Sequence, residues 1–169
     1  MSSDLRDLYQ EVILDHNKRP RNFGRLDAAN RTAEGYNPLC GDRVKLFVDV
    51  EDGKVRDIAF EGSGCAISTA SASLMTEALK GRTLDEAHEL FHLFHDLATT
   101  GATEGDPALG KLAVFGGVRE FPIRVKCATF IRRSSRPQQA PPQLRPARRG
   151  EPHGGGVQPA VRRPGEALR

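Results

Sequence analysis

The stretch Gly62-Ser63-Gly64-Cys65 constrains the fold of this chain most, because it joins a strand pattern to a helix pattern. Before it, apolar and polar residues alternate on both sides of Asp52-Gly53, which predicts a β-hairpin over 43–61. After it, residues 66–80 predict a helix, and Cys65 falls in its first turn, where the helix dipole and free amides favour a thiolate. The alternative is a buried structural cysteine that follows a Gly-rich turn.

Other segments supply further helices and one more strand. The periodicity predicts a capped amphipathic helix over 3–17, a helix with a capping box over 84–97, and a shorter helix that begins at Asp106-Pro107. An edge strand is expected at 32–36. A kinked connector is expected at 118–124, directly before Cys127.

Charge and composition change abruptly at residue 132. Residues 1–131 hold sixteen Lys and Arg against twenty Asp and Glu, whereas 132–169 hold nine Arg against two Glu. The second segment also has seven of the eleven prolines and no Phe, Tyr, Trp, Ile or Met. Because it cannot bury enough apolar surface to offset the entropy of ordering, we expect one domain at 1–131 and a disordered Arg/Pro/Gly-rich tail at 132–169.

Three cysteines, an odd number spaced far apart, are not typical of a secreted disulfide framework. The N-terminus is charged, without an apolar signal core, and no run of about 18 apolar residues occurs. The sequence therefore predicts a cytoplasmic protein without a membrane partner. Since the net charge of +3 comes from the tail, it gives no sign that the folded part binds nucleic acid.

Three thiols and one carboxylate form the most informative set of side chains, and each thiol lies at a predicted junction between elements. These residues are Cys40, Asp42, Cys65 and Cys127. Junctions at one end of a sheet can converge, and Zn²⁺ accepts four ligands of this kind in tetrahedral geometry, while thiolates also hold iron-sulfur clusters. No C-x-x-C pair exists, so the spacing alone leaves metal binding and separate structural cysteines both open.

Three segments around these cysteines resemble the signature segments of the U-type iron-sulfur cluster assembly proteins, the family of the NifU N-terminal domain. They are 37–42, 62–68 and 121–128, and the opening 8–16 is similar to the same family. The resemblance covers about residues 4–130. It implies an α+β fold, a small antiparallel β-sheet with helices packed on one face.

Within this family the match is to the SufU type. The IscU type places a histidine directly before the third cysteine, where this chain has Lys126, and carries a Leu-Pro-Pro-Val-Lys motif that is absent here. The stretch 99–117 also corresponds to an insertion typical of SufU proteins.

The resemblance implies a site and a mechanism. Cys40, Asp42, Cys65 and Cys127 would bind Zn²⁺, and Cys40 would accept sulfur from a SufS-type cysteine desulfurase after a partner histidine takes its place on the metal. The protein would then be a sulfurtransferase-like acceptor rather than a free-standing enzyme, and it would serve downstream iron-sulfur assembly proteins.

Two other functions compete with this one. The first is a scaffold that binds iron and assembles a [2Fe-2S] cluster on the same four ligands. The second is a nucleic-acid binder that acts through the Arg-rich tail, although a tail without aromatic residues supports only non-specific, salt-sensitive binding. We expect no specific nucleic-acid partner.

The resemblance ends near residue 130. In the family a long apolar helix begins at the third cysteine, whereas here Cys127 is soon followed by Arg132 and Arg133. An excess of Arg, Pro, Gly and Ala is what out-of-frame translation of a GC-rich gene produces, so we hypothesise a frameshift near residue 130.

The histidines are interpreted as non-ligands. His16, near the end of the first predicted helix, is expected to be a cation suited to a helix C-terminus. His88, His92 and His95 share one helical face and could chelate a metal, but a solvated face is the favoured interpretation.

Overall fold

The structure is a computed structural model that describes residues 3–130. The chain divides into two units, Met1–Gln138 and Gln139–Arg169, and all described residues belong to the first. The predictions of a disordered tail at 132–169 and of a frameshift near residue 130 concern sequence that lies outside the described residues.

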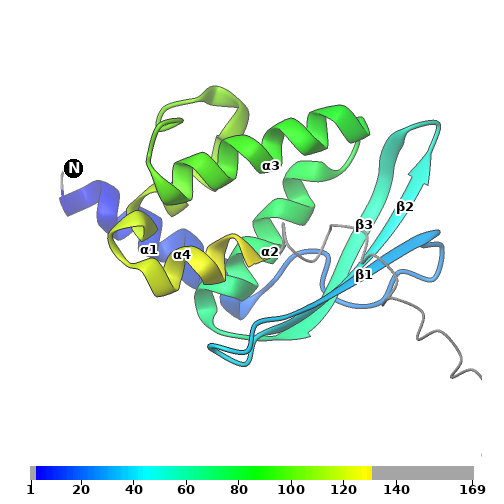
Figure 1. Ribbon diagram of the computed structural model, residues 1–169, viewed down its shortest axis with the longest axis horizontal. Coiled ribbons are helices and arrows are strands. Elements are labelled where there is room, and N and C mark those ends of the chain that lie inside the picture. The colour runs from blue at the N-terminus through cyan, green and yellow to red at the C-terminus, as the bar shows by residue number, and fades with distance from the viewer. Residues whose placement is uncertain (1–2, 131–169) are drawn as a thin grey trace, which may run out of the picture. The chain divides into compact units, whose positions relative to one another are not determined.

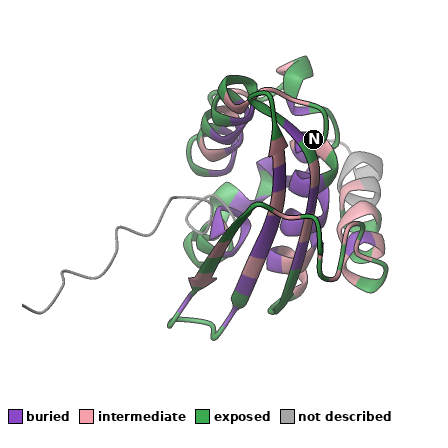
Figure 2. Cartoon of the chain, turned by 90° about the vertical axis from the view of Figure 1, so that its right-hand side faces the viewer, coloured by how far each residue is buried: buried purple, intermediate pink, exposed green. Residues whose placement is uncertain are grey.

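The described unit is α+β, which confirms the predicted fold class. One antiparallel sheet has the strand order β1-β2-β3, and the helices lie on one side of it (Figures 1 and 2). The elements in chain order are α1 (Ser3–Lys18), β1 (Arg31–Tyr36), β2 (Arg43–Glu51), β3 (Lys54–Ser63), α2 (Ala66–Leu79), α3 (Leu84–Thr99), the 3₁₀ helix η1 (Pro107–Glu120) and α4 (Pro122–Ala128).

The strand register brings the predicted junctions to one end of the sheet. The predicted hairpin forms as β2 and β3, joined by Asp52 and Gly53, which both have positive φ. At the far end Arg43 pairs with Tyr36 on one side and with Ser63 on the other. The loop between β1 and β2 and the turn after β3 therefore start from adjacent positions.

Helix α2 is the centre of the helical layer. It is buried along most of its length and contacts α1, β3, η1 and α4. Figure 2 shows buried residues running along the strands, with exposed residues at their ends and in the turns. Small side chains in the first half of α2 allow neighbouring backbones to come close, and the Ser71 hydroxyl donates to the Ala128 carbonyl at 2.5 Å. This bond fastens the C-terminal end of α4 to α2.

The two predictions on the segment before Cys127 have different outcomes. The helix expected at Asp106-Pro107 is confirmed: Asp106 caps it by accepting from the Ala108 amide at 2.8 Å, and it continues as a 3₁₀ helix with a break at Gly110. The expected connector at 118–124 is mostly helical, because Pro122 starts α4 instead of breaking the chain. Proline suits a first helical position, since its φ is already helical and its missing N–H has no intrahelical partner there.

No helix within residues 3–130 combines the length and the apolar character that a bilayer crossing needs.

Candidate metal centre

The loop that carries Cys40 and Asp42 is closed by its own hydrogen bonds. The Asn37 amide donates to the Asp42 carbonyl and the Gly41 amide donates to the Asn37 carbonyl, both at 2.8 Å. Gly41 has φ +76°, a left-handed conformation that glycine adopts without steric cost. The loop leaves Cys40 exposed and returns Asp42 to the interior, where only 2% of its surface is accessible.

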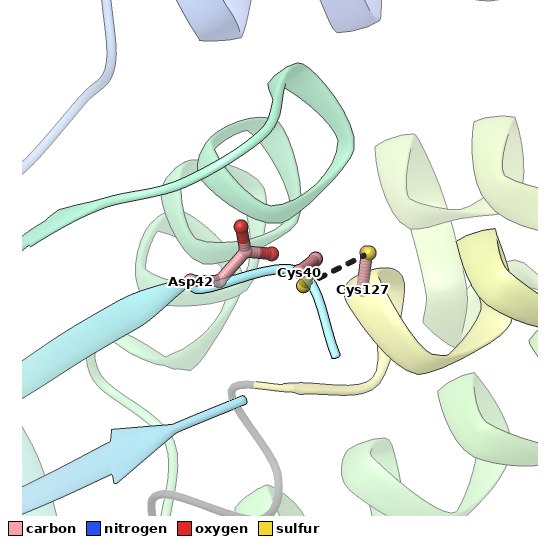
Figure 3. A group of neighbouring side chains, drawn as sticks. All are labelled: Cys40, Asp42 and Cys127. Atoms are coloured by element: carbon pink, nitrogen blue, oxygen red, sulfur yellow. Dashed lines mark hydrogen bonds between the residues drawn. The ribbon is translucent and has the colours of Figure 1, made fainter. Parts of the chain in front are cut away.

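Helix α4 brings the third cysteine to this loop. Cys127 is buried, and its Sγ donates to Cys40 Sγ at 3.8 Å. Figure 3 shows these two side chains pointing toward one another, with Asp42 beside them at the start of β2. Ligand atoms of Cys40, Asp42 and Cys127 all lie within 4.8 Å of one another. Three of the four predicted site residues are therefore brought together, although they are up to 87 positions apart in sequence.

Cys65 lies beside this group rather than in it. It is the N-cap of α2, where its Sγ accepts from the Ser68 amide at 3.4 Å, which agrees closely with the predicted position in the first turn. Its own amide donates to Asp42 Oδ1 at 3.1 Å. Cys65 thus contributes a thiol next to the group and also a backbone contact that holds its carboxylate.

The second oxygen of Asp42 is the unusual atom of the site. Asp42 Oδ2 is buried and has no hydrogen-bond partner among the described residues. A buried carboxylate oxygen without a partner costs free energy, and native structures contain few such atoms. A cation at this position would remove that cost.

Cys127 is held in its protonated form by its surroundings. Burial, followed by the nearby thiols of Cys65 and Cys40, raises the pKa of the Cys127 thiol above its usual range. A cation bound beside Cys127 would favour its thiolate instead. The donor set, thiols plus one carboxylate with an unpartnered oxygen, fits Zn²⁺ or an iron-sulfur cluster.

The position of Cys127 differs from the sequence expectation. It lies in the last turn of α4, neither after an irregular connector nor at the start of a helix. It therefore lacks the positive end of a helix dipole, which would lower its pKa.

The expectation that His16 is a cation is also wrong. His16 is buried, its Nδ1 lies 2.8 Å from the Ser73 hydroxyl, and burial lowers its pKa below the usual value. His88 and His92 are exposed, in agreement with the solvated face favoured for that helix. Sequence reasoning missed the burial of His16, and it missed the contact of the Cys65 amide with Asp42. The motif Gly-Ser-Gly-Cys was the available signal for the second.

The chain matches a known protein family over most of its length. The model of the NifU-like N terminal domain matches residues 8–128. The chain is 41% identical over 128 residues to the iron-sulfur cluster assembly scaffold protein IscU of Streptococcus pyogenes serotype M1, covering 76% of this chain and 80% of that protein. It is also 41% identical over 129 residues to the zinc-dependent sulfurtransferase SufU of Bacillus subtilis, covering 76% of this chain and 87% of that protein.

A solved structure is similar as well. It is the crystal structure of a putative iron-sulfur cluster assembly scaffold protein for the SUF system from Fervidobacterium islandicum. The TM-score is 0.70 at 34% identity, and the match covers 79% of this chain and 96% of the other.

Proposed function

The chain belongs to the NifU-like N-terminal domain family, and from that premise we propose that it is an iron-sulfur cluster assembly protein that accepts sulfur at a zinc-binding centre. Its relatives include a zinc-dependent sulfurtransferase and several cluster assembly scaffolds, each at about two fifths identity. The sulfur-transfer function is preferred because the site combines an exposed thiol with a buried carboxylate oxygen that has no hydrogen-bond partner in the described part of the chain.

The proposed ligands are Cys40, Asp42, Cys65 and Cys127. The observation that carries this assignment is the position of Asp42 Oδ2, which is buried beside two thiols 3.8 Å apart and has no hydrogen-bond partner within residues 3–130. Bound there, Zn²⁺ would keep the thiols deprotonated at neutral pH. Protein groups hold the carboxylate in place, since the Cys65 amide donates to Asp42 Oδ1.

Cys40 is the proposed sulfur acceptor. Cys127 is buried, whereas Cys40 and Cys65 are both exposed. Of these two, Cys65 is the N-cap of α2 and its sulfur accepts from the Ser68 amide, while Cys40 lies in the loop before β2. The Cys40 thiolate would attack the outer sulfur of a donor persulfide. A new S–S bond forms on Cys40 while the S–S bond of the donor breaks, and the donor cysteine leaves as a thiolate.

The proposed donor is a cysteine desulfurase of the SufS type, and downstream iron-sulfur assembly proteins are the proposed recipients. Large apolar side chains flank the thiols, Leu39 beside Cys40 and Ile123 one helical turn before Cys127, with 69% and 71% of their surface exposed. Exposed apolar side chains around a reactive thiol favour a protein donor over a small one. The three free thiols suit a reducing compartment, and we place the protein in the cytoplasm.

A scaffold that assembles a [2Fe-2S] cluster is the second candidate. The same donor set supports it, because thiolates with one oxygen ligand can hold either a cluster or zinc. Absorption spectroscopy of the purified protein separates the two functions. Visible charge-transfer bands would favour the scaffold, whereas colourless protein with one bound zinc favours sulfur transfer.

Replacing Cys40 tests the proposal directly. The desulfurase is charged with ³⁵S from labelled cysteine, and the label that reaches this chain is measured on a non-reducing gel. We expect Cys40→Ala to receive no label, because the nucleophile is gone. Thr99→Ala, on the exposed end of α3, is the control and should be labelled like the native protein. Undiminished labelling of Cys40→Ala would sink the acceptor assignment.

A further inference from the structure

Gly64 lies against the carboxylate of Asp42. A Cβ atom added at Gly64 would come within 3.0 Å of both Cγ and Oδ1 of Asp42, and within 3.1 Å of the Ser68 hydroxyl. Real Cβ atoms rarely make contacts this short. The φ of Gly64 is outside the left-handed region, so its backbone conformation does not itself require glycine. The space that the Asp42 carboxylate and the Ser68 hydroxyl occupy is therefore the reason for glycine at this position.

That space lies at the beginning of α2, where free amide groups and the helix dipole favour an anion. Asp42 uses this environment with one oxygen only, since Oδ1 accepts from the Cys65 amide at 3.1 Å. The other oxygen, Oδ2, is buried and has no partner among the residues that the structure describes. The carboxylate thus has one oxygen committed to the protein and one left for a ligand.

We propose that Gly64 is a positioning residue: its missing side chain lets the Asp42 carboxylate rest on the N-terminus of α2, which holds Oδ1 and leaves Oδ2 for the metal. The inference rests on the proposed metal centre and adds how its carboxylate is held. Asp42 would offer Oδ2 to a metal while Oδ1 stays bonded to the Cys65 amide. Because that bond does not depend on the metal, Asp42 would be the ligand that is released most easily.

The test compares Gly64→Ala with Asp42→Ala and the double variant. The control is Gly117→Ala, at an exposed position where an added Cβ would meet no atom within 4 Å and where φ is also outside the left-handed region. The first measurement is the rate of zinc release to a chelating dye. The second, on metal-free protein, is hydrogen exchange of the Cys65 amide by NMR.

We expect Gly64→Ala to slow zinc release about tenfold, the order of effect of a charge-assisted hydrogen bond, in the same direction as Asp42→Ala. In the Asp42→Ala background it should have no further effect on zinc release, because the close contact that remains is with the Ser68 hydroxyl, which is not a proposed ligand. The Cys65 amide should lose protection in Gly64→Ala and keep it in Gly117→Ala.

Additive effects of the two substitutions on zinc release would overturn the inference, since they would show that Gly64 acts on the fold rather than on Asp42. Unchanged protection of the Cys65 amide in metal-free Gly64→Ala would overturn it as well. A native protein that binds no zinc would instead overturn the proposed function, and the amide measurement would still decide whether Gly64 positions Asp42.

Discussion

Two buried polar clusters adjoin α2, and they differ in how far their hydrogen bonds are satisfied. In the first, the Ser73 hydroxyl accepts from the Arg21 amide at 2.7 Å and lies 2.8 Å from His16 Nδ1, while Thr76 accepts from Asn22 at 3.2 Å. In the second, at the N-terminal end of α2, Asp42 has one oxygen bonded and one without a partner among the described residues. We call the first the serine cluster and the second the cysteine cluster.

This difference in hydrogen bonding indicates that the serine cluster has a structural role and the cysteine cluster a ligand-binding role. The serine cluster is complete, because none of its fully buried side-chain nitrogen and oxygen atoms lacks a hydrogen-bond partner among the described residues. His16 Nδ1 and the Ser73 hydroxyl share a hydrogen bond of 2.8 Å, and the Glu77 carboxylate lies 3.9 Å from His16 Nε2. A complete network fixes α1 against α2 and needs no ligand. The cysteine cluster is incomplete, which is what a site that awaits a cation requires.

The largest expected effect is a loss of zinc affinity when the cysteine cluster, but not the serine cluster, is altered. Cys127→Ser should lower zinc affinity by more than about 100-fold, the upper cost of removing even an outer-shell partner, because it removes a buried ligand. Ser73→Ala should keep full zinc content but lose about 2 kcal/mol of unfolding free energy, since it leaves buried polar groups unpaired. Zinc titration and urea unfolding of both variants check this. If Ser73→Ala also emptied the site, the two clusters would be one cooperative unit.

A smaller effect is expected inside the cysteine cluster. Asp42→Ala removes the hard ligand and leaves three soft thiolates, so the protein should retain its metal, exchange it more slowly, and transfer sulfur poorly. Cys65→Ala should lose the metal instead. Metal analysis after dialysis, followed by the ³⁵S assay, compares the two variants. Loss of metal from Asp42→Ala as complete as from Cys65→Ala would make the carboxylate a structural ligand.

Much of this arrangement could be predicted from the sequence, because it depends on local patterns. Alternation and the Asp52-Gly53 turn set the hairpin register, and that register places the loop of Cys40 next to Cys65. The approach of Cys127 was not predictable, since it depends on Pro122 starting a helix after a 3₁₀ segment. The burial of His16 was missed for a similar reason. The sequence places His16 near the end of a helix, but it does not show that His16 lies against Ser73 of another helix.

The serine cluster should also make stability depend on pH. Burial, followed by the charge of Arg21, lowers the pKa of His16 below 6.5, and the charge of Lys111 adds to the lowering. The charges of Glu77 and Asp15 act in the opposite direction. The unfolded chain therefore binds a proton below about pH 6.5 that folded His16 does not, and the unfolding free energy falls as the pH drops through that range.

His16→Gln should remove this component, at most about 1.4 kcal/mol per pH unit for one proton. Urea unfolding of the native protein and the variant between pH 5 and 8 gives the difference, in which the carboxylates common to both cancel. Parallel curves for the two proteins would mean that His16 has the same pKa in the folded and unfolded states, and the serine cluster would then carry a buried charge at low pH.

The smallest expected effect concerns the domain boundary. We propose that residues 1–131 form the complete domain, because the segment 132–169 holds seven of the eleven prolines and no Phe, Tyr, Trp, Ile or Met, and so has little apolar surface to bury. Deleting 132–169 should leave the melting temperature and the zinc content nearly unchanged.

Deleting from Pro122 onward is the matched control. It should abolish both folding and zinc binding, because it removes Cys127 and the buried Ala128 and Phe130. Melting curves and zinc analysis of the two truncations measure the effect. A large loss of stability on deletion of 132–169 alone would place part of the folded domain beyond residue 131. That part would then have to be included when the serine and cysteine clusters are compared.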